Sequence, residues 1–303
     1  MERQHYLITG GSGFIGLALI PTLLKQGHQI SLLSRKPEKT LQQFGAPPDL
    51  HTFSDFAQLD RTLAFDGVIN LAGQGIADQR WSAAVKKQLT DSRILTTRAL
   101  VNWLAQAEQQ PKILVSGSAI GYYGLRGDER LDEQAQGDDS FASTLCQQWE
   151  QEAQAAEALG IRTCYLRTGI VLGKGGGALA RMLPPFRFGL GGPIGSGEQW
   201  MSWIHRDDLV NLILLALERD DLNGPLNGTA PEPVTSREFA RTLGHTLNRP
   251  AILPMPAFAV KLLFGQMGEE LLLSGQRVIP AKAQDLGYTF RYPQLQEALR
   301  AIV

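Results

Sequence analysis

Cysteine is scarce in this chain, and its few cysteine and histidine residues do not cluster. Cys146 and Cys164 are the two cysteines among 303 residues, which is too few for a disulfide framework and indicates reduced thiols. The five histidines are scattered, with no pair at metal-ligand spacing, so we predict no metal site. The sequence enters a strand pattern at its start, without the charged and apolar regions of a signal peptide. We therefore expect a cytoplasmic protein.

A charge excess of either sign is also missing. The chain has 29 basic and 30 acidic residues, a net charge of -1, whereas nucleic acids and anionic membrane surfaces attract strongly basic proteins. No apolar run reaches the ~18 residues that a bilayer requires, because Asn211 interrupts the richest stretch, residues 209–217. We therefore expect a small-molecule substrate and predict neither nucleic acid nor a membrane as a partner. The sequence leaves the oligomeric state open, a homodimer included.

Glycine, in contrast, is abundant. The chain has 32 glycines, more than the usual share of about 7%. Glycine adopts positive φ and lets the backbone approach another group closely. Ten of the glycines fall between residues 169 and 197, where we expect the backbone to pass near a bound ligand and to form a flexible entrance to its pocket.

Apolar runs alternate with helical patterns along the first two-thirds of the chain, and 43% of the residues are hydrophobic. The patterns predict strands at 6–9, 29–34, 67–72, 112–116 and 161–167, and helices at 14–25, 82–106 and 140–159. Short strands separated by helices imply right-handed crossovers and a parallel sheet that is buried on both faces. We predict an α/β protein with a Rossmann-type, doubly wound parallel sheet.

The pattern changes after residue 170. We expect the Rossmann domain to span 1–170, with 200–225 returning to it, and a smaller C-terminal substrate lobe to consist of 171–199 and 226–303. Within these parts, Asp207 or Asp208 is expected to cap a helix. The spacing of Thr235 and Glu238 predicts a capping box on a helix that runs to residue 247.

A glycine-rich turn joins the first strand to the first helix. Gly10, Gly13 and Gly16 have the spacing that gives a tight turn, room for a pyrophosphate, and close packing of helix on sheet. The helix N-terminus adds free N–H groups and a positive dipole end. Ser12, Phe14 and Ile15 complete this predicted dinucleotide site.

The end of the second strand indicates which dinucleotide binds. An NAD site usually has an acidic residue there, which accepts a hydrogen bond from the ribose 2'-hydroxyl. This chain has Ser34, Arg35 and Lys36 instead. Because a guanidinium can bind a 2'-phosphate with paired hydrogen bonds, we predict NADP(H) as the cofactor. The alternative is that the two cations merely end a strand in solvent.

Two further segments are candidates for cofactor contact. Leu71, Ala72 and Gly73 stand at the end of the strand predicted at 67–72, where small residues let the backbone pass beneath the adenosine half of the cofactor. Gln88 and Arg93 lie on the helix after it. Arg93 is predicted to reach either a phosphate or a loop carbonyl, and the alternative for both side chains is a solvated helix face.

Several motifs together resemble the extended short-chain dehydrogenase/reductases of the NAD(P)-dependent epimerase/dehydratase family. They are GGSGFIG at 10–16, NLAG at 70–73, VSGSA at 115–119, GYYG at 121–124 and RTGIVLG at 167–173. The resemblance is closest to the YfcH-like branch of epimerase family proteins. Its motifs are matched by LCQQWE at 145–150, GLGGPIGSG at 189–197, SWIH at 202–205 and the C-terminal segment GQRVIP at 275–280.

The resemblance implies a catalytic serine and a Tyr-x-x-x-Lys pair. Ser118 matches the serine, but no tyrosine in this chain has a lysine four residues later. The region where the pair belongs ends at Glu150, whose charge is opposite to that of the family's lysine, so Glu150 cannot take over the lysine's role. Tyr122 or Tyr123 is the best candidate for the acid, with an aromatic lid as the alternative role.

Other side chains offer weaker substitutes. Cys146 is either a thiol acid or a small buried apolar residue, and His205 is either a proton-transfer group or a helix cap. Trp200 and Trp203 line a pocket or cover the interface of the lobe. We expect an NADP-dependent oxidoreductase or epimerase-like enzyme that acts on a carbonyl or secondary alcohol of a small molecule. The alternative is a non-catalytic NADPH-binding sensor or interaction protein with the same fold.

Overall fold

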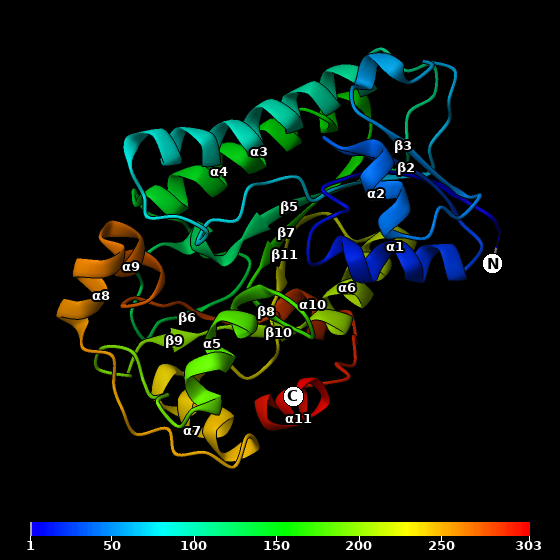
Figure 1. Ribbon diagram of the computed structural model, residues 1–303. Helices are drawn as coiled ribbons and strands as arrows, with labels where there is room; N and C mark the ends of the chain where they lie inside the picture. The colour runs from blue at the N-terminus through cyan, green and yellow to red at the C-terminus, as the bar shows by residue number, and fades with distance from the viewer. Residues whose placement is uncertain (1) are drawn as a thin grey trace.

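A seven-stranded parallel sheet forms the centre of the protein in the computed structural model, which describes residues 2–303. The strand order is β11-β7-β5-β4-β1-β2-β3, and each neighbouring pair is parallel. The strands are β1 (His5–Thr9), β2 (Gln29–Leu33), β3 (Leu50–Phe53), β4 (Gly67–Asn70), β5 (Ile113–Ala119), β7 (Arg162–Thr168) and β11 (Gly224–Gly228). Figure 1 shows this sheet between two layers of helices.

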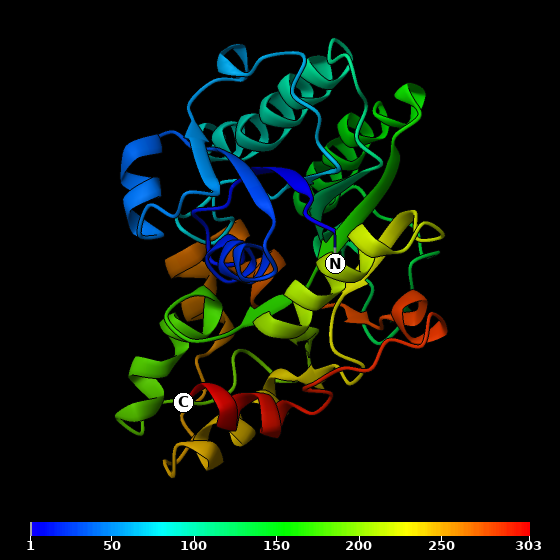
Figure 2. The ribbon, with the colours of Figure 1, turned by 90° about the vertical axis from the view of Figure 1, so that its right-hand side faces the viewer.

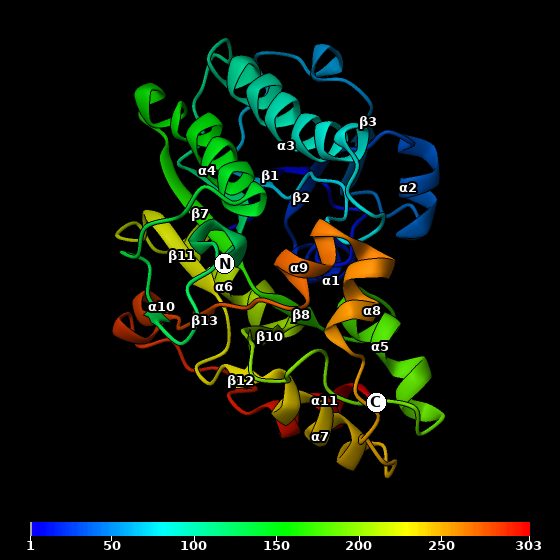
Figure 3. The same ribbon diagram turned by 90° about the vertical axis from the view of Figure 1, so that its left-hand side faces the viewer.

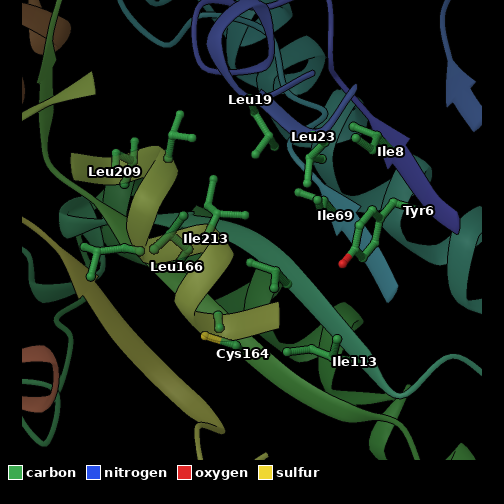
Figure 4. Close-up of a cluster of buried hydrophobic side chains, with 14 of the residues drawn as sticks. Tyr6, Ile8, Leu19, Leu23, Ile69, Ile113, Cys164, Leu166, Leu209 and Ile213 are labelled. Atoms are coloured by element: carbon green, nitrogen blue, oxygen red, sulfur yellow. The ribbon is translucent and has the colours of Figure 1, made fainter. Parts of the chain in front are cut away.

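The helices of the large domain cover both faces of the sheet, as Figures 1 and 2 show. They are α1 (Gly16–Lys25), α2 (Pro37–Gln43), α3 (Ala83–Leu104), α4 (Phe141–Gln154) and α6 (Arg206–Glu218), with 3-10 turns η1 (Phe56–Gln58), η2 (Ile120–Tyr123) and η3 (Glu157–Leu159). One core lies between the sheet and helices α1 and α6, and includes Leu19, Ile69 and Ile213 (Figure 4). A second core joins the other face to α3 and α4. Burial on both faces explains why the central strands are continuously apolar.

The predicted fold class is confirmed, but several observed elements differ from the predicted ones. Strands β3 and β11 of the main sheet and helix α2 were not predicted, because LHTF, GPLNG and PEKTLQQ are short and only partly apolar. The cap expected from Asp207 or Asp208 is wrong, because His205 is the N-cap of α6 and its Nδ1 accepts the backbone N–H of Asp207 at 3.1 Å. The capping box of Thr235 and Glu238 is confirmed.

A smaller group of elements packs below the carboxyl ends of the strands (Figure 1). It consists of two-stranded pairs β8 (Ile170–Leu172) with β10 (Trp203–His205) and β9 (Trp200–Met201) with β12 (Val234–Thr235), and helices α5 (Gly177–Arg187), α7 (Ser236–Thr246) and α11 (Leu295–Ile302). These elements share a core of their own, with Trp203 and Phe239 fully buried in it. Trp203 is therefore a core residue.

Residues 257–285 cross back to the large domain. Their elements are α8 (Ala257–Phe264), α9 (Gln266–Leu271), β13 (Arg277–Val278) and α10 (Ala281–Asp285), and β13 pairs with β6 (Arg130–Leu131). Met267 of α9 packs with Trp81, Leu89 and Leu145, which places α9 against the first turns of α3 and α4 (Figure 3). Among residues 2–303, no helix is both long and apolar enough to cross a bilayer.

The chain order in the sheet fixes where a ligand can bind. β1 lies between β4 and β2, so the connections leave it in opposite directions on the two sides. Open α/β sheets bind ligands in the crevice beyond the carboxyl ends of the strands at such a switch point. Thr9 ends β1 at this place, and the glycine-rich turn follows it directly.

Candidate functional site

The turn after β1 has the shape of a phosphate cradle. Gly10 has φ +69°, and a Cβ there would overlap the backbone of Leu71, which follows β4. A Cβ at Gly16 would overlap the backbone of Gly11, so helix α1 packs directly on the turn. Glycine is therefore required at both positions by geometry.

The first turn of α1 leaves donors available. Gly13 N–H bonds to the carbonyl of Gly10 at 3.0 Å and closes the turn. The backbone N–H groups of Phe14 and Ile15 have no backbone acceptor within the described chain, and Ile15 supplies no side-chain cap. Free N–H groups at a helix N-terminus bind anions. This geometry fits a dinucleotide pyrophosphate, and the exposed Ser12 stands at the same turn.

The Phe14 side chain packs against the glycine-rich segment that follows β8. A Cβ at Gly176 or Gly177 would come within 2.9 Å of the Phe14 ring, and the Arg206 guanidinium lies 4.8 Å from the ring centre. Phe14 therefore fills the space that the glycines after β8 leave open. These glycines have a packing role, in contrast to the flexible entrance that the sequence led us to expect.

The end of β2 presents two cations. Arg35 and Lys36 are exposed, and neither forms an ion pair within residues 2–303. Ser34 is buried, and its hydroxyl lies 2.7 Å from that of Thr40 and accepts the N–H of Lys36 at 3.2 Å. Ser34 thus shapes the turn that carries the cations. Within residues 2–303, no carboxylate stands at the end of β2, where a ribose 2'-hydroxyl would need one.

A buried hydrogen-bond chain fixes the segment after β4. The side-chain oxygen of Asn70 accepts the hydroxyl of Thr9 at 2.6 Å, and its amide donates to Thr97 at 2.8 Å and to Ser116 at 3.2 Å. The N–H of Ala72 in turn bonds to the Thr9 hydroxyl at 3.3 Å. This brace, which sequence reasoning missed, holds the carboxyl ends of β1, β4 and β5 together.

Arg93 is a positioning residue for the loop after Gly73. Its guanidinium donates to the carbonyl of Gln74 at 2.9 Å and to that of Leu89 at 3.0 Å, and it lies 5.1 Å from the Trp149 ring. Burial lowers the pKa of this guanidinium. Of the two contacts predicted for Arg93, the structure shows the loop carbonyl. Gln88, one turn earlier on α3, is exposed.

Ser118 belongs to a buried hydrogen-bond network that the sequence did not reveal. Its hydroxyl donates to the Glu150 carboxylate at 2.6 Å, and Arg167 binds the same carboxylate with two hydrogen bonds of 2.8 and 2.9 Å. Both partners of this ion pair are well buried, with side chains 4% and 11% exposed. Burial alone would lower the pKa of Arg167, but the hydrogen bonds and charge of Glu150 outweigh it and raise that pKa. The geometry commits the Ser118 proton to Glu150, and Ser118 is itself buried, with 4% of its surface exposed.

The two tyrosines of η2 differ in what they can do. Tyr123 is fully buried, its hydroxyl donates to Asn227 at 2.6 Å, and it accepts from Arg167 at 3.1 Å. Burial raises the pKa of Tyr123 to about 12. Tyr122 is half-buried, and its ring stacks on the Arg167 guanidinium at 3.4 Å. Tyr122 is therefore the phenol that a ligand can reach more easily.

Glu133 is a second buried carboxylate in this network. One of its oxygens accepts the backbone N–H of Asn227 at 3.0 Å, and the other accepts that of Lys282 at 3.2 Å. Burial raises the pKa of Glu133. The carboxylate ties β11 to the start of α10, which is a structural role.

The contacts of the other candidate residues, two cysteines, a histidine and a tryptophan, indicate structural roles. Burial raises the pKa of Cys146 to about 11 and that of Cys164 to about 12, so both stay neutral thiols at physiological pH. Burial lowers the pKa of His205, which caps α6. Trp200 lines a cavity of about 350 Å³ between the loop after η2 and residues 273–275, and its indole N–H donates to Asp128 at 2.6 Å.

The chain is similar to known proteins over nearly its whole length. The model of the NAD dependent epimerase/dehydratase family matches residues 6–227, and a domain of unknown function (DUF1731) matches residues 255–302. An Arabidopsis thaliana protein named "Epimerase family protein SDR39U1 homolog, chloroplastic" is 42% identical over 98% of this chain and 86% of its own length. The human epimerase family protein SDR39U1 is 40% identical over 99% of this chain and its own full length. A crystal structure of the human protein (isoform 2) with NADPH has a TM-score of 0.88 at 38% identity, covering 98% of both chains.

Proposed function

The chain belongs to the NAD dependent epimerase/dehydratase family, and from this premise we propose that it binds NADP(H) and acts on an alcohol or carbonyl group of a small molecule. The observation that carries the proposal is the glycine cradle after β1 beside a β2 end that has two free cations and no carboxylate. The human relative was crystallised with NADPH, which supports the same cofactor. The cofactor and the reaction are supported by different residues.

The cofactor part rests on the fit of this chain's residues. The N–H groups of Phe14 and Ile15 would bind the pyrophosphate, and Arg35 and Lys36 would bind the 2'-phosphate. Leu71 and the residues after it would support the adenosine half from below. When bound, NADP(H) supplies or accepts a hydride. We expect Arg93 to act indirectly, by holding the loop at Gln74.

The reaction part rests on Ser118. Because its hydroxyl donates to Glu150, Ser118 can only accept a hydrogen bond from a ligand. A substrate hydroxyl suits this acceptor, whereas a carbonyl oxygen offers it no proton. Tyr122, which stacks on Arg167, is the accessible phenol and the candidate for proton exchange with the substrate oxygen. We infer that a secondary alcohol is the form of the substrate that Ser118 orients.

Family branch, domain roles and location are parts of the same proposal. The match at residues 255–302 supports placing the chain in the YfcH-like branch, to which the segment 275–280 also points. Residues 171–199 and 226–303 would hold the substrate against the Rossmann domain formed by 1–170 and 200–225, with two adjustments: residues 200–205 pack in the smaller core, and the sheet extends to residue 228. We propose a cytoplasmic location from the scarcity of cysteine. The homodimer stays a prediction.

One observation favours a second function. Arg167 touches both tyrosines but is neutralised by the Glu150 carboxylate, and the Tyr-x-x-x-Lys pair is absent, so the reaction end lacks an unpaired cation that would assist a phenol. A non-catalytic NADPH-binding protein, with a sensing or interaction role, would have this combination of a formed cofactor site and a neutralised reaction end. The two functions share the cofactor and differ in turnover.

Steady-state oxidation of NADPH and reduction of NADP⁺ across panels of ketones, aldehydes and secondary alcohols tests the proposal. Turnover that falls by about 100-fold or more in Ser118→Ala, with NADPH affinity unchanged, would support the role of Ser118. Ser140→Ala is the matched control, because this half-buried serine lies at the start of α4 and bonds to Asp138. Tight NADPH binding without turnover on any panel would favour the non-catalytic function.

A further inference from the structure

One face of the protein, formed by the smaller lobe and α8, carries large apolar side chains that no residue of 2–303 covers. We call it the apolar-basic face, and its apolar members are 40–80% exposed: Phe188, Leu190, Ile252, Leu253, Met255, Phe258, Leu262 and Leu263. Monomeric proteins rarely expose contiguous apolar patches of this kind without an interaction partner. These residues come from two segments that lie far apart in the sequence.

Backbone contacts make the face continuous. The N–H of Leu253 bonds to the carbonyl of Gly191 at 3.1 Å, and that of Met255 bonds to Pro193 at 3.0 Å, so the two segments run side by side. The Nε of Arg249 bonds to the carbonyl of Arg187 at 3.0 Å. Helix α8 follows two residues after Met255, on the side of the molecule seen in Figure 3.

Helix α8 has one buried residue, and its apolar side chains face outward. Val260 is fully buried, whereas Phe258, Leu262 and Leu263 are 74%, 73% and 58% exposed. Arg80 donates to the carbonyl of Leu262 at 3.4 Å and helps to hold the helix to the body. The helix is thus attached along one edge and presents its apolar side to the surroundings.

The same two segments are devoid of carboxylates. Residues 175–197 and 239–268 contain no Asp or Glu and carry five cations, Arg181, Arg187, Arg241, Arg249 and Lys261, in a chain whose net charge is -1. Arg181 pairs with Asp78, and Lys261 pairs with Glu269 at 3.0 Å. Arg187 and Arg249 form no ion pair with any residue of 2–303. The even overall charge balance conceals this local positive charge.

We propose that the apolar-basic face docks peripherally on an anionic lipid bilayer. Phe258, Leu262 and Ile252 would enter the boundary between headgroups and acyl chains, and Arg187 and Arg249 would contact anionic headgroups. This partner is one that the overall charge balance had led us to predict against. The proposal does not depend on the cofactor or on turnover.

Charge and shape distinguish a lipid surface from a second copy of the chain. A symmetric dimer through this face would bring the same cations of both copies together, with no carboxylate in either segment to neutralise them. The side chains that are 73–80% exposed lie on α8 and on the two loop segments, and a fluid interface accommodates them without a complementary shape. A lipid headgroup layer supplies the missing negative charge.

Flotation of the full chain with lipid vesicles tests the proposal. We expect binding to vesicles of equal parts phosphatidylcholine and phosphatidylglycerol, little binding to phosphatidylcholine alone, and weaker binding as salt increases. Two double variants, Phe258→Ser/Leu262→Ser and Arg187→Gln/Arg249→Gln, should weaken binding. We expect the affinity of each for mixed vesicles to fall by at least about tenfold. Leu95→Ser is the matched control, because Leu95 is 54% exposed on α3, outside this face, and this variant should float like the wild type.

Three results would overturn the proposal. The first is no flotation of the wild type with mixed vesicles, and the second is binding that neither double variant weakens. The third is a concentration-dependent dimer in sedimentation velocity that Phe258→Ser/Leu262→Ser abolishes, which would assign the face to a second copy. Far-UV circular dichroism of each variant tests whether it is folded, and the arginine variant carries the test if the apolar variant does not fold.

Discussion

The two ends of the proposed crevice are built in different ways. At the cofactor end, the site is formed by the backbone. Gly10 and Gly16 let neighbouring backbone segments pack closely, and the free N–H groups come from neighbouring residues of one turn. At the reaction end, side chains from β5, α4 and β7 meet in a buried ion pair, Glu150 with Arg167, that holds Ser118.

This difference determines which amino-acid substitutions each end tolerates. A backbone cradle is insensitive to most side-chain changes and fails when a Cβ is added. A buried ion pair fails when either partner is removed, because the other charge is left without a partner. The same comparison predicts which substitutions affect folding, which affect cofactor binding, and which affect neither.

The largest effect is expected from breaking the ion pair at the reaction end. Arg167→Met leaves Glu150 buried without a cation, and we expect the free energy of unfolding to fall by about 3 to 5 kcal/mol. Urea denaturation measures it. Arg98→Met is the control, because Arg98 pairs with Glu152 at the surface, with 53% of its side chain exposed, and should cost about 1 kcal/mol or less. Equal losses in the two variants would show that Arg167 has no special role.

A smaller but still large effect is expected from filling the cradle at the cofactor end. Gly10→Ala places a Cβ on the backbone of Leu71, and we expect the dissociation constant of NADPH to rise about 100-fold, or ~2.7 kcal/mol. Fluorescence titration checks this, with near-UV circular dichroism as a test of folding. Gly27→Ala is the control: Gly27 has φ +86°, but its surroundings are open, so NADPH affinity should not change. An unchanged NADPH affinity in Gly10→Ala would show that the turn after β1 does not bind the cofactor.

Charge at the end of β2 should have an intermediate effect that depends on the cofactor. Removing either cation, by Arg35→Ala or Lys36→Ala, should weaken NADPH binding about tenfold, ~1.4 kcal/mol each, and leave NADH binding unchanged. Lys39→Ala, an exposed cation on α2, should change neither. Parallel titrations at two salt concentrations measure the differences. A loss of NADH affinity equal to that of NADPH would mean that these cations do not bind the 2'-phosphate.

A different kind of effect, a dependence of stability on pH, is expected from the two buried thiols. Burial raises the pKa of Cys146 to about 11 and of Cys164 to about 12, whereas an unfolded thiol titrates near ~8.5. The unfolded state therefore loses protons first, and the stability that the thiols contribute is complete below pH ~8.5 and falls as pH rises toward the folded values, by at most ~1.4 kcal/mol per pH unit per thiol.

A comparison of unfolding between pH 8 and pH 10.5 isolates this contribution. We expect the free energy of unfolding of Cys146→Ala/Cys164→Ala to depend less on pH than that of the wild type. Cys146 should also resist a thiol reagent in the native state at pH 8. Rapid reaction of Cys146 would contradict its burial and restore it as a candidate acid.

The sequence predicted the parallel sheet and the cofactor end because their determinants are local. Residues 10–16 are contiguous, and helix periodicity and apolar strands extend over single elements. The reaction end depends on contacts between residues distant in the chain: Glu150 with Arg167, and Tyr123 with Asn227, 104 positions away. A lone Glu or Arg in a sequence has no pattern that indicates its partner. The apolar-basic face was missed for a related reason, because overall charge does not record where charges lie.

The central claim is that the cradle after β1 and the cations after β2 together select NADPH. Equilibrium titration of the wild-type chain with NADPH and NADH, side by side and at the same salt concentration, tests this most directly. We expect NADPH to bind at least about tenfold more tightly than NADH, because the cations contact a phosphate that NADH lacks. NADH binding as tightly as NADPH, or more tightly, would contradict it.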